Sequence, residues 1–419
     1  MIIYFLPVFF LALFVAVYKK YKDICNPCVL FMLCYFVSTY LLVFYKNKWK
    51  VDLDVRTFWI IVIGAIVFMI GTLFGNIFTI RKGSKTSHNR IEMITVSASM
   101  TAIIIGINII YILLILRSVR GSGSLAERIF AQRMANVSDI DSGSMLTNVL
   151  GRVSECAVYI YAYAFLNNYI GYRQCDLLLL VPIIPRVLST LLLGGRMGSF
   201  RMIVAFIVMG YIIRRRHDIS GDEHLIKEIF KYGSIGLLMV FVFYKLAEFI
   251  GRTPNANITD YIARYFSGGV ALLNMYIKKP YRETHLFGGE TFYYLYKTLY
   301  RLGMPIDISS MGNYYLDMRA SNGIVLGNVY TAYRRYISDF GYIGMIFFQF
   351  IYSLLMTILY KNVKKGKRFI IIVYVYLAWS IILHPVDENF FSSVINPSFL
   401  INMGLFYGIY KTVIRYRDM

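Results

Sequence analysis

The chain has 419 residues, of which 58% are hydrophobic and only 16% are charged. Soluble globular proteins contain roughly 45–50% apolar and about 25% charged residues, and the mean hydropathy of +0.58 lies well to the apolar side. This composition excludes an ordinary cytosolic enzyme, a disordered chain and a disulfide-rich secreted module. It predicts an integral membrane protein with many spans.

Apolar segments need about 20 residues each to cross roughly 30 Å of hydrocarbon. The first apolar run has no basic residues before it and no small-residue cleavage site, so we expect a retained span and not a signal peptide. The predicted fold class is an all-α polytopic membrane protein with about eleven transmembrane helices, near residues 2–18, 28–45, 57–78, 94–116, 148–169, 177–194, 200–213, 233–250, 340–360, 369–385 and 398–414.

The segment 177–213 allows two interpretations. The run at 200–213 is short for a span, and Pro182 and Pro185 interrupt the run before it. Proline removes a backbone donor, and a broken helix at membrane depth is tolerated only where protein or water covers the freed groups. The segment therefore holds either two spans or one re-entrant element.

Basic residues predict the orientation. The net charge is +21, with 44 Lys and Arg against 23 Asp and Glu, and every second loop is basic. Cytoplasmic loops of membrane proteins accumulate Lys and Arg, so this balance requires no nucleic-acid partner. We expect the N-terminus outside the cytoplasm and the C-terminus inside it. The basic groups are Lys19, Lys20 and Lys22, then Arg81, Lys82, Lys85 and Arg90, then Arg214, Arg215 and Arg216, then Lys361, Lys364, Lys365, Lys367 and Arg368, and finally Lys411, Arg415 and Arg417.

This orientation divides the chain into three parts. Residues 1–250 contain eight spans and an external loop near 117–147, residues 251–338 form a large external loop, and residues 339–419 contain three more spans. Connections longer than about 12–15 residues are usually functional or disordered. The large loop is rich in Tyr, Phe, Leu and Ile, which argues against disorder. We therefore expect it to be partly helical and functional.

The external loops are basic as well, which the orientation rule does not explain. Residues 251–338 contain seven arginines, three lysines and five acidic residues. Arginine grips phosphate or carboxylate groups bidentately, so we expect an anionic ligand on the outer face. The alternative is a solvated surface, because long loops cross the membrane regardless of charge.

Further arginines lie near the predicted outer surface. Arg196 and Arg201 are framed by glycines in a tight hairpin, where a diphosphate could approach the backbone closely. The alternative is that they snorkel to lipid headgroups. Arg128 and Arg133 lie in an amphipathic segment near 124–134, which is typical of a helix on the bilayer surface.

Other chemistries find little support in the residues. The five cysteines include a single Cys25-Asn-Pro-Cys28 pair without a second pair, which argues against zinc. His285 and His384 are the external histidines, and neither has a second histidine at metal-binding spacing. The chain has no phosphate-binding loop and no nucleophile elbow. We expect no metal and no cofactor.

One segment resembles a known family. Residues Gly327-Asn-Val-Tyr330-Thr331, Arg334-Arg335 and Asp339-Phe-Gly341, which run into a span, are similar to a signature of the Wzy-type O-antigen polymerases. Two earlier pieces of the large loop and Gly195-Arg196 look like the same family's loop and arginine hairpin, so the resemblance covers about residues 190–345. The pieces of the loop are Tyr265-Phe-Ser-Gly268-Gly269 and Phe287-Gly-Gly-Glu-Thr291-Phe292.

This resemblance implies a function. Wzy-type enzymes join oligosaccharide units carried on undecaprenyl diphosphate at the periplasmic face of the bacterial inner membrane. The growing glycan leaves its lipid diphosphate and is transferred to a sugar hydroxyl of the next lipid-linked unit. Such enzymes resemble the metal-independent GT-C class, and their pathway includes a flippase and a chain-length regulator.

The residues that fit this chemistry fall into two groups. Fixed guanidinium groups stabilise the charge that develops on a departing diphosphate, and the acceptor hydroxyl needs a base. We expect Arg196, Arg334 and Arg335 in the first role, and Asp339, Glu290 and His384, in that order, in the second. Asp339 has a structural alternative as a helix N-cap or as a salt-bridge partner of Arg335. The expected substrate-binding residues are Arg201, Arg128, Arg133, Arg264, Arg282, Tyr330 and Thr331.

Two other functions stay open. An O-antigen ligase would share the topology and the donor but would transfer the glycan to lipid A core. A flippase for lipid-linked oligosaccharides would place its charges within the membrane and would not need a long external loop. Because many arginines lie in loops, the sequence favours chemistry at one face.

Overall fold

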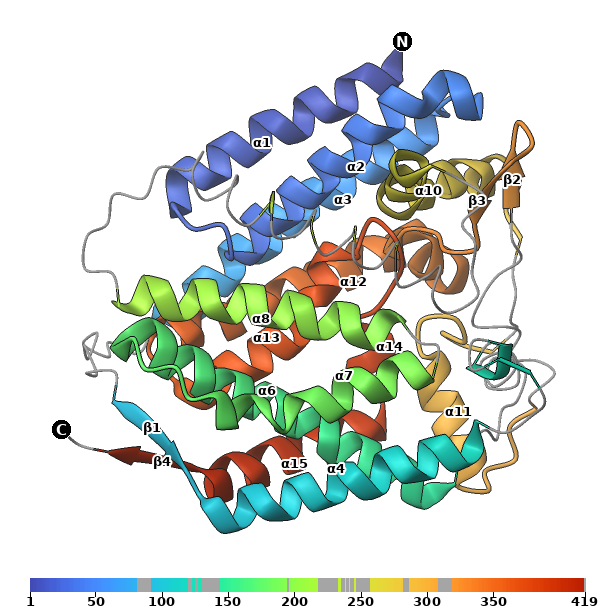
Figure 1. Cartoon of the computed structure of the whole chain (residues 1–419). Coiled ribbons are helices and arrows are strands. Elements are labelled where there is room, and N and C mark those ends of the chain that lie inside the picture. The colour runs from blue at the N-terminus through green and yellow to red at the C-terminus, as the bar shows by residue number, and fades with distance from the viewer. Residues whose placement is uncertain are drawn as a thin grey trace. The chain divides into compact units, whose positions relative to one another are not determined.

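In the computed structural model the chain is mostly helical (Figure 1). The structure describes residues 1–80, 92–119, 123–124, 127–129, 144–193, 196–217, 233–234, 238, 241, 245, 257–281, 286–307 and 319–417, with the backbone alone at 79, 80, 196 and 417. Within this part, seven helices are long and apolar enough to cross a membrane: α1 with the 3-10 helix before it (Ile2–Tyr21), α2 (Pro27–Trp49), α3 (Val55–Ile80), α4 (Ala98–Ser118), α6 (Met145–Tyr172), α8 (Arg196–His217) and α12 (Ala332–Lys364). The prediction of an all-α polytopic membrane protein is confirmed.

Shorter helices occupy three further predicted spans. The 3-10 helix η2 (Leu177–Leu180) and α7 (Ile183–Leu192) form one short apolar element, and α13 (Arg368–Ile382) forms another. α15 (Pro397–Val413) follows the four-residue helix α14 (Phe391–Val394). Most of the predicted span at 233–250 lies outside the described residues, so the count of eleven stays a prediction. The run at 200–213 is part of the longer α8, which removes the objection that it is too short.

The chain forms two compact units, each built from segments far apart in sequence. Unit 1 combines Met1–Ser87, Thr259–Lys367 and Leu377–Phe399, and unit 2 combines His88–Ile258, Arg368–Tyr376 and Leu400–Met419.

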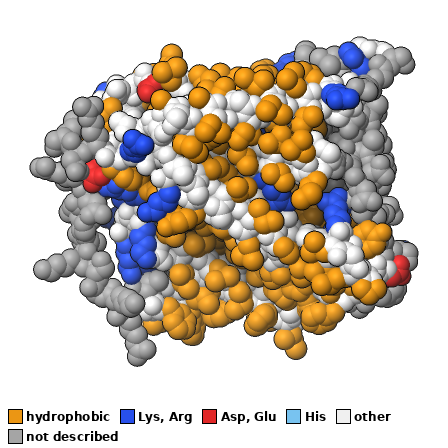
Figure 2. Space-filling model, turned by 90° about the horizontal axis from the view of Figure 1, so that it is seen from below, with side chains coloured by type: hydrophobic (Ala, Val, Ile, Leu, Met, Phe, Trp, Pro, Cys, Tyr) orange, Lys and Arg blue, Asp and Glu red, His pale blue; other side chains and the backbone are white. Residues whose placement is uncertain are grey.

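Hydrophobic side chains spread across the face shown in Figure 2, interrupted by small groups of basic side chains. An apolar exterior of this kind suits contact with lipid.

Unit 1 is centred on the packing of α3 against α12. Gly71 and Gly75 of α3 face Ser353 and Thr357 of α12 so closely that a Cβ atom at either glycine would collide with them. Lipid tails are as apolar as Leu, so membrane helices gain from small residues that let the backbones approach. The GxxxG spacing of these glycines therefore explains why two distant segments of the chain pair here.

The predicted large loop contains regular structure of its own. α10 (Ile258–Lys278) is amphipathic and buries its apolar face, and α11 (Tyr293–Arg301) is a shorter helix. The strands β2 (Arg319–Ser321) and β3 (Ile324–Gly327) form an antiparallel hairpin that turns at Asn322 and Gly323. Both turn residues have positive φ, as a two-residue hairpin turn requires.

An asparagine side chain and a close backbone contact at a glycine hold α10 against its neighbours in unit 1. The Asn274 amide donates to the Asp52 carbonyl and accepts from the Asp54 N–H, both at 2.8 Å. A Cβ atom at Gly269 would lie only 2.5 Å from the Pro385 carbonyl oxygen. Close approach at Gly269 brings α10 against the turn that follows α13, where several of the site residues lie.

Unit 2 contains α4, α6, α7 and α8, together with a small sheet. The strand β1 (Met93–Val96) pairs antiparallel with β4 (Ile414–Arg417) near the C-terminus, with Ile94 opposite Tyr416 (Figure 1). The Asn168 amide accepts from the Ile94 N–H at 2.9 Å and donates to the Ile94 carbonyl at 2.7 Å. This side chain attaches the sheet to α6.

Candidate functional site

Arg334 and Arg335 form the centre of the candidate site in unit 1. They lie in the first turn of α12, with Thr331 as the N-cap, and their side chains are only 0% and 4% exposed. Successive residues of a helix point about 100° apart, so the two guanidinium groups reach different partners. Both arginines of the doublet are therefore buried and engaged.

Arg334 pairs with Glu290, which lies in the turn before α11. Nη1 of Arg334 contacts Oε2 of Glu290, and the Ser338 hydroxyl donates to Oε1 of the same carboxylate at 2.7 Å. Glu290 is only 4% exposed. One buried cation and one buried anion thus neutralise each other, and both oxygens of Glu290 have partners.

Arg335 forms a bidentate ion pair with Asp387, in the turn after α13. Nε and Nη2 of Arg335 donate to the two carboxylate oxygens of Asp387 at 2.8 and 3.0 Å. Nη1 donates to the Glu290 carbonyl at 3.4 Å. The planar guanidinium matches a carboxylate in this way, whereas a lysine offers a single charged nitrogen. Arg335 therefore links the 383–390 turn to the turn that carries Glu290.

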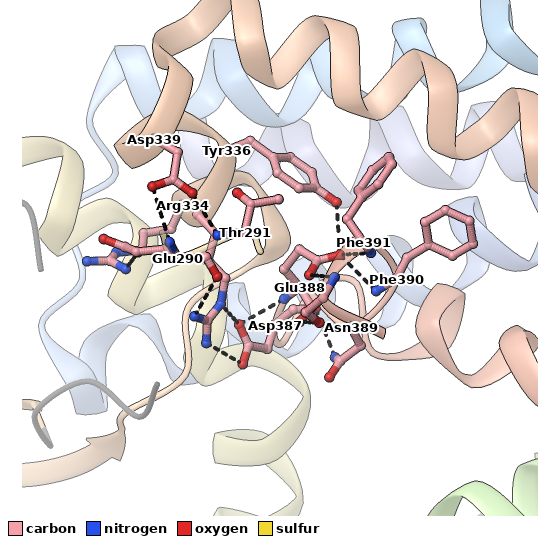
Figure 3. Close-up of polar contacts among 12 residues, drawn as sticks. Glu290, Thr291, Arg334, Tyr336, Asp339, Asp387, Glu388, Asn389, Phe390 and Phe391 are labelled. Carbon is pink, nitrogen blue, oxygen red and sulfur yellow. Dashed lines mark hydrogen bonds and ion pairs between the residues drawn. The ribbon is translucent and has the colours of Figure 1, made fainter. Parts of the chain in front are cut away.

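The Asp339 side chain binds the backbone of the turn that carries Glu290. Its carboxylate accepts from the N–H of Thr291 at 2.7 Å and from the N–H of Glu290 at 3.3 Å. α12 begins at Ala332 with Thr331 as its N-cap, so Asp339 is not at the N-terminus of α12. The side chain instead holds Glu290 in place opposite Arg334 (Figure 3).

Glu388 lies next to Asp387 and accepts several hydrogen bonds from backbone N–H groups. Its carboxylate accepts from the N–H groups of Phe390, Phe391 and Ser392 at 2.8, 2.6 and 2.9 Å. Burial raises the pKa of Glu388, while these backbone donors and the charge of Arg335 oppose the shift. The residue shapes the turn that presents Asp387 to Arg335.

Three tyrosines surround the guanidinium group of Arg334. The Cζ atom lies 5.0 Å from the ring centre of Tyr276, 5.2 Å from that of Tyr281 and 5.6 Å from that of Tyr330. Arg319 of β2 lies 4.5 Å from the ring centre of Tyr281. Cations above aromatic faces are attracted by the ring quadrupole, so α10 and the hairpin both contribute to holding Arg334.

His384, the third expected base, belongs to a different network. Its Nδ1 lies 2.9 Å from the Tyr35 hydroxyl and its Nε2 lies 2.9 Å from Oε1 of Gln349. The side chain is 2% exposed and its ring stacks on Tyr352. Both ring nitrogens are therefore occupied within the core of unit 1, among α2, α12 and the 383–390 turn.

The remaining predicted site residues are distributed over the chain. Arg196 and Arg201 lie at the start of α8 in unit 2, with only the backbone of Arg196 described, and Arg128 is half-buried. Arg264 is half-buried on α10, whereas Tyr330 and Thr331 are buried just before α12. Arg133 and Arg282 lie outside the described residues.

The sequence analysis missed Asp387 and Glu388. They stand between two predicted spans in a short turn, where two adjacent carboxylates are a signal that could have been noticed. Charged side chains beside membrane spans are usually paired or functional. In the part of the chain that the structure describes, no group of three His, Cys, Asp or Glu side chains is arranged to hold a metal ion.

We compared the chain with known protein families, curated proteins and solved structures. No family model, no curated protein and no solved structure matches the chain. The chemistry therefore has to be argued from the site itself. Two adjacent guanidinium groups, each neutralised by one carboxylate, could bind a larger anion if that anion displaced the carboxylates.

Proposed function

We propose that the protein is a glycosyltransferase that polymerises undecaprenyl-diphosphate-linked oligosaccharide units into O-antigen polysaccharide. The observation that supports this proposal is the buried pair of Arg334 and Arg335, bound to Glu290 and Asp387. A buried ion pair rarely stabilises a protein more than well-packed apolar residues would. Two such pairs on neighbouring residues are therefore better explained by chemistry that needs fixed positive charge.

In the proposed reaction an acceptor hydroxyl oxygen forms a bond to the anomeric carbon of the growing glycan. The bond between that carbon and the diphosphate oxygen breaks, and its electron pair stays on the diphosphate. Arg334 and Arg335 stabilise this charge when the diphosphate takes the place of the carboxylates that they bind in the structure. The resemblance implies a metal-independent reaction, so these cations would do the work of a metal ion.

The hydroxyl proton passes to a carboxylate. We assign this role to Glu290, because its side chain contacts Arg334, whereas the oxygens of Asp339 bind the backbone of the turn. A diphosphate that binds Arg334 would compete with Glu290 for the guanidinium group and leave the carboxylate able to accept a proton. Asp339 then acts as a positioning residue, and His384 takes no part.

The proposed function implies a location in the cell and a set of partner molecules. The protein would span the bacterial inner membrane about eleven times in a GT-C-like arrangement, with the site on the periplasmic side. Its substrates would be two lipid-linked oligosaccharides, delivered by a flippase and regulated by a protein that controls chain length.

Deletion of the gene, followed by a gel of surface lipopolysaccharide, tests the function. A core band that carries a single repeat unit, with the ladder lost and restored by the cloned gene, is the expected result. Bare core with long polymer retained on undecaprenyl diphosphate would assign the protein as a ligase. Bare core with single units trapped inside the cell would assign it as a flippase, and an unchanged ladder would refute all three functions.

A further inference from the structure

Unit 2 contains charged residues within its apolar helices. Arg152 and Glu155 lie near the start of α6, Arg186 lies on α7 and Arg201 lies in the second turn of α8. Ionisable side chains in membrane-spanning helices are costly and usually mark a site. The sequence analysis named only Arg201, as part of a surface hairpin.

Hydrogen bonds attach Arg152, Glu155 and Arg186 to neighbouring helices of unit 2. Nη2 of Arg186 lies 3.1 Å from Oε2 of Glu155, and Nη1 of Arg186 donates to the Tyr111 hydroxyl at 3.2 Å. Nη1 of Arg152 donates to Oδ1 of Asn402 at 3.2 Å. The contacts join α4, α6, α7 and α15, so the charged groups belong to the interior of unit 2.

Tyr159 lies one helical turn after Glu155 and faces this group. Its side chain is 2% exposed, and its ring packs edge-on against Tyr376 and Phe406. The ring lies within electrostatic range of Glu155, Arg186 and Arg201. Among the described residues, its hydroxyl has no hydrogen-bond partner.

A buried hydroxyl without a partner loses its hydration and gains nothing in return. An ion pair that holds α7 against α6 would explain Arg186 and Glu155. It would not explain why Arg201 lies within electrostatic range of the buried Tyr159, nor why Arg152 lies within electrostatic range of Cys156, the residue after Glu155. A bound anion would explain both, because it accepts from the hydroxyl and pairs with several cations.

We propose that Arg152, Arg186, Arg201 and the Tyr159 hydroxyl form an anion site for the phosphate or diphosphate head group of a polyprenyl lipid. Guanidinium groups bind phosphate oxygens bidentately, and the apolar helices around the site suit an isoprenoid tail. The link to catalysis rests on the proposed function, since a polymerase must hold two lipid-linked units by their diphosphates. The anion site itself does not depend on that function.

Equilibrium binding tests the site without any sugar substrate. The full-length protein in phosphatidylcholine nanodiscs is titrated with geranylgeranyl diphosphate, with inorganic diphosphate, and with geranylgeraniol as the uncharged control. We expect the diphosphate lipid to bind and the alcohol not to bind. Tighter binding of the lipid than of inorganic diphosphate would support a lipid head group, and equal binding would support the anion site and assign it to soluble phosphate. Nanodiscs that contain phosphatidylglycerol test whether an ordinary anionic lipid competes with geranylgeranyl diphosphate for the site, and we expect this competition to be weak.

Three variants and one control make the test specific. Tyr159→Phe should weaken binding about three- to tenfold, the loss of one hydrogen bond, without lowering the unfolding temperature. Arg152→Gln and Arg201→Gln should each weaken it about tenfold or more, because charged donors are lost. Arg173→Gln removes the same charge from an exposed position at the other end of α6 and should bind normally.

Several outcomes would overturn the proposal. These are no binding to the unaltered protein, unchanged affinity in Tyr159→Phe and both arginine variants, or an equal loss in Arg173→Gln. A lower unfolding temperature of Tyr159→Phe with unchanged affinity would show that the hydroxyl only supports packing. If binding behaves as expected but deletion of the gene leaves the lipopolysaccharide ladder intact, the anion site is supported and the polymerase function is refuted.

Discussion

At the scale of single residues, the arginine doublet shows how position on a helix separates two identical side chains. Arg334 turns toward Glu290 and three tyrosines, whereas Arg335 turns toward Asp387. The sequence predicts that this doublet is important, but it does not say which arginine faces inward. Both do, because segments on either side of α12 each supply a carboxylate.

The ion pair of Arg335 and Asp387 leads to a prediction that separates stability from activity. Arg335→Ala leaves the Asp387 carboxylate buried without its bidentate partner, which should lower the free energy of unfolding by about 3–5 kcal/mol. Arg335→Lys should restore the charge but little activity, because one ammonium group cannot make both hydrogen bonds. Thermal unfolding in detergent and the lipopolysaccharide ladder measure the two effects.

The double variant Arg335→Met with Asp387→Leu is the matched control. Replacing both charges with apolar side chains should recover most of the lost stability, while the ladder stays absent. A double variant that restores the ladder would show that Arg335 has only a structural role.

At the scale of elements, α12 combines two functions that a break separates. Residues 332–340 carry the ion pairs, and the part after Gly341 continues as a long apolar helix. Gly341 has φ 68° and ψ −168°, a backbone conformation that is essentially restricted to glycine. The break lets one continuous segment place its first turns at an angle to the span.

Gly341→Ala should therefore destabilise the protein. A Cβ atom has open space at this position, so the cost comes from the backbone conformation, about 1–3 kcal/mol. Gly106→Ala is the matched control, because Gly106 lies inside the helix α4 and an added Cβ also meets nothing within 4 Å. That variant should be neutral or slightly more stable. Equal unfolding temperatures for both variants would contradict the argument.

At the scale of the whole molecule, each compact unit is built from distant parts of the chain. Unit 1 joins the first three helices to the large loop and to α12, and all the ion pairs of the candidate site lie within it. The basic loops predict which ends of the helices face the cytoplasm. Orientation in the membrane follows from charge and insertion and not from packing.

Cysteine labelling tests that orientation. Cys175 is free and exposed after α6, in a loop predicted to be cytoplasmic, so a membrane-impermeant maleimide should label it only after spheroplasts are permeabilised. In a Cys175→Ser background, Met304→Cys places a thiol at a 49% exposed position after α11. This thiol should be labelled in intact spheroplasts. The reverse pattern would invert the topology and remove the periplasmic site.

Much of the architecture could be predicted from the sequence, but less of the site. Long apolar runs indicate helices because hydrocarbon leaves the backbone no other partner, and the amphipathic α10 arises from a region that the sequence marks as ordered. Glu290, Arg334, Arg335 and Asp339 were all predicted as site residues, and the structure brings them together. Their catalytic roles stay predictions, and Asp387 was missed because its partner lies 52 residues away.

The sequence by itself determined that this is a helical membrane protein with a long basic segment between two of its apolar regions, since composition and hydropathy act locally along the chain. Only the tertiary structure decided which charges meet. Asp387 pairs with Arg335, and Asp339 binds the backbone beside Glu290. The His384 ring lies outside the site, between Tyr35 and Gln349. The physical reason is that a buried charge must find a partner, and which partner it finds depends on segments that only folding brings into contact.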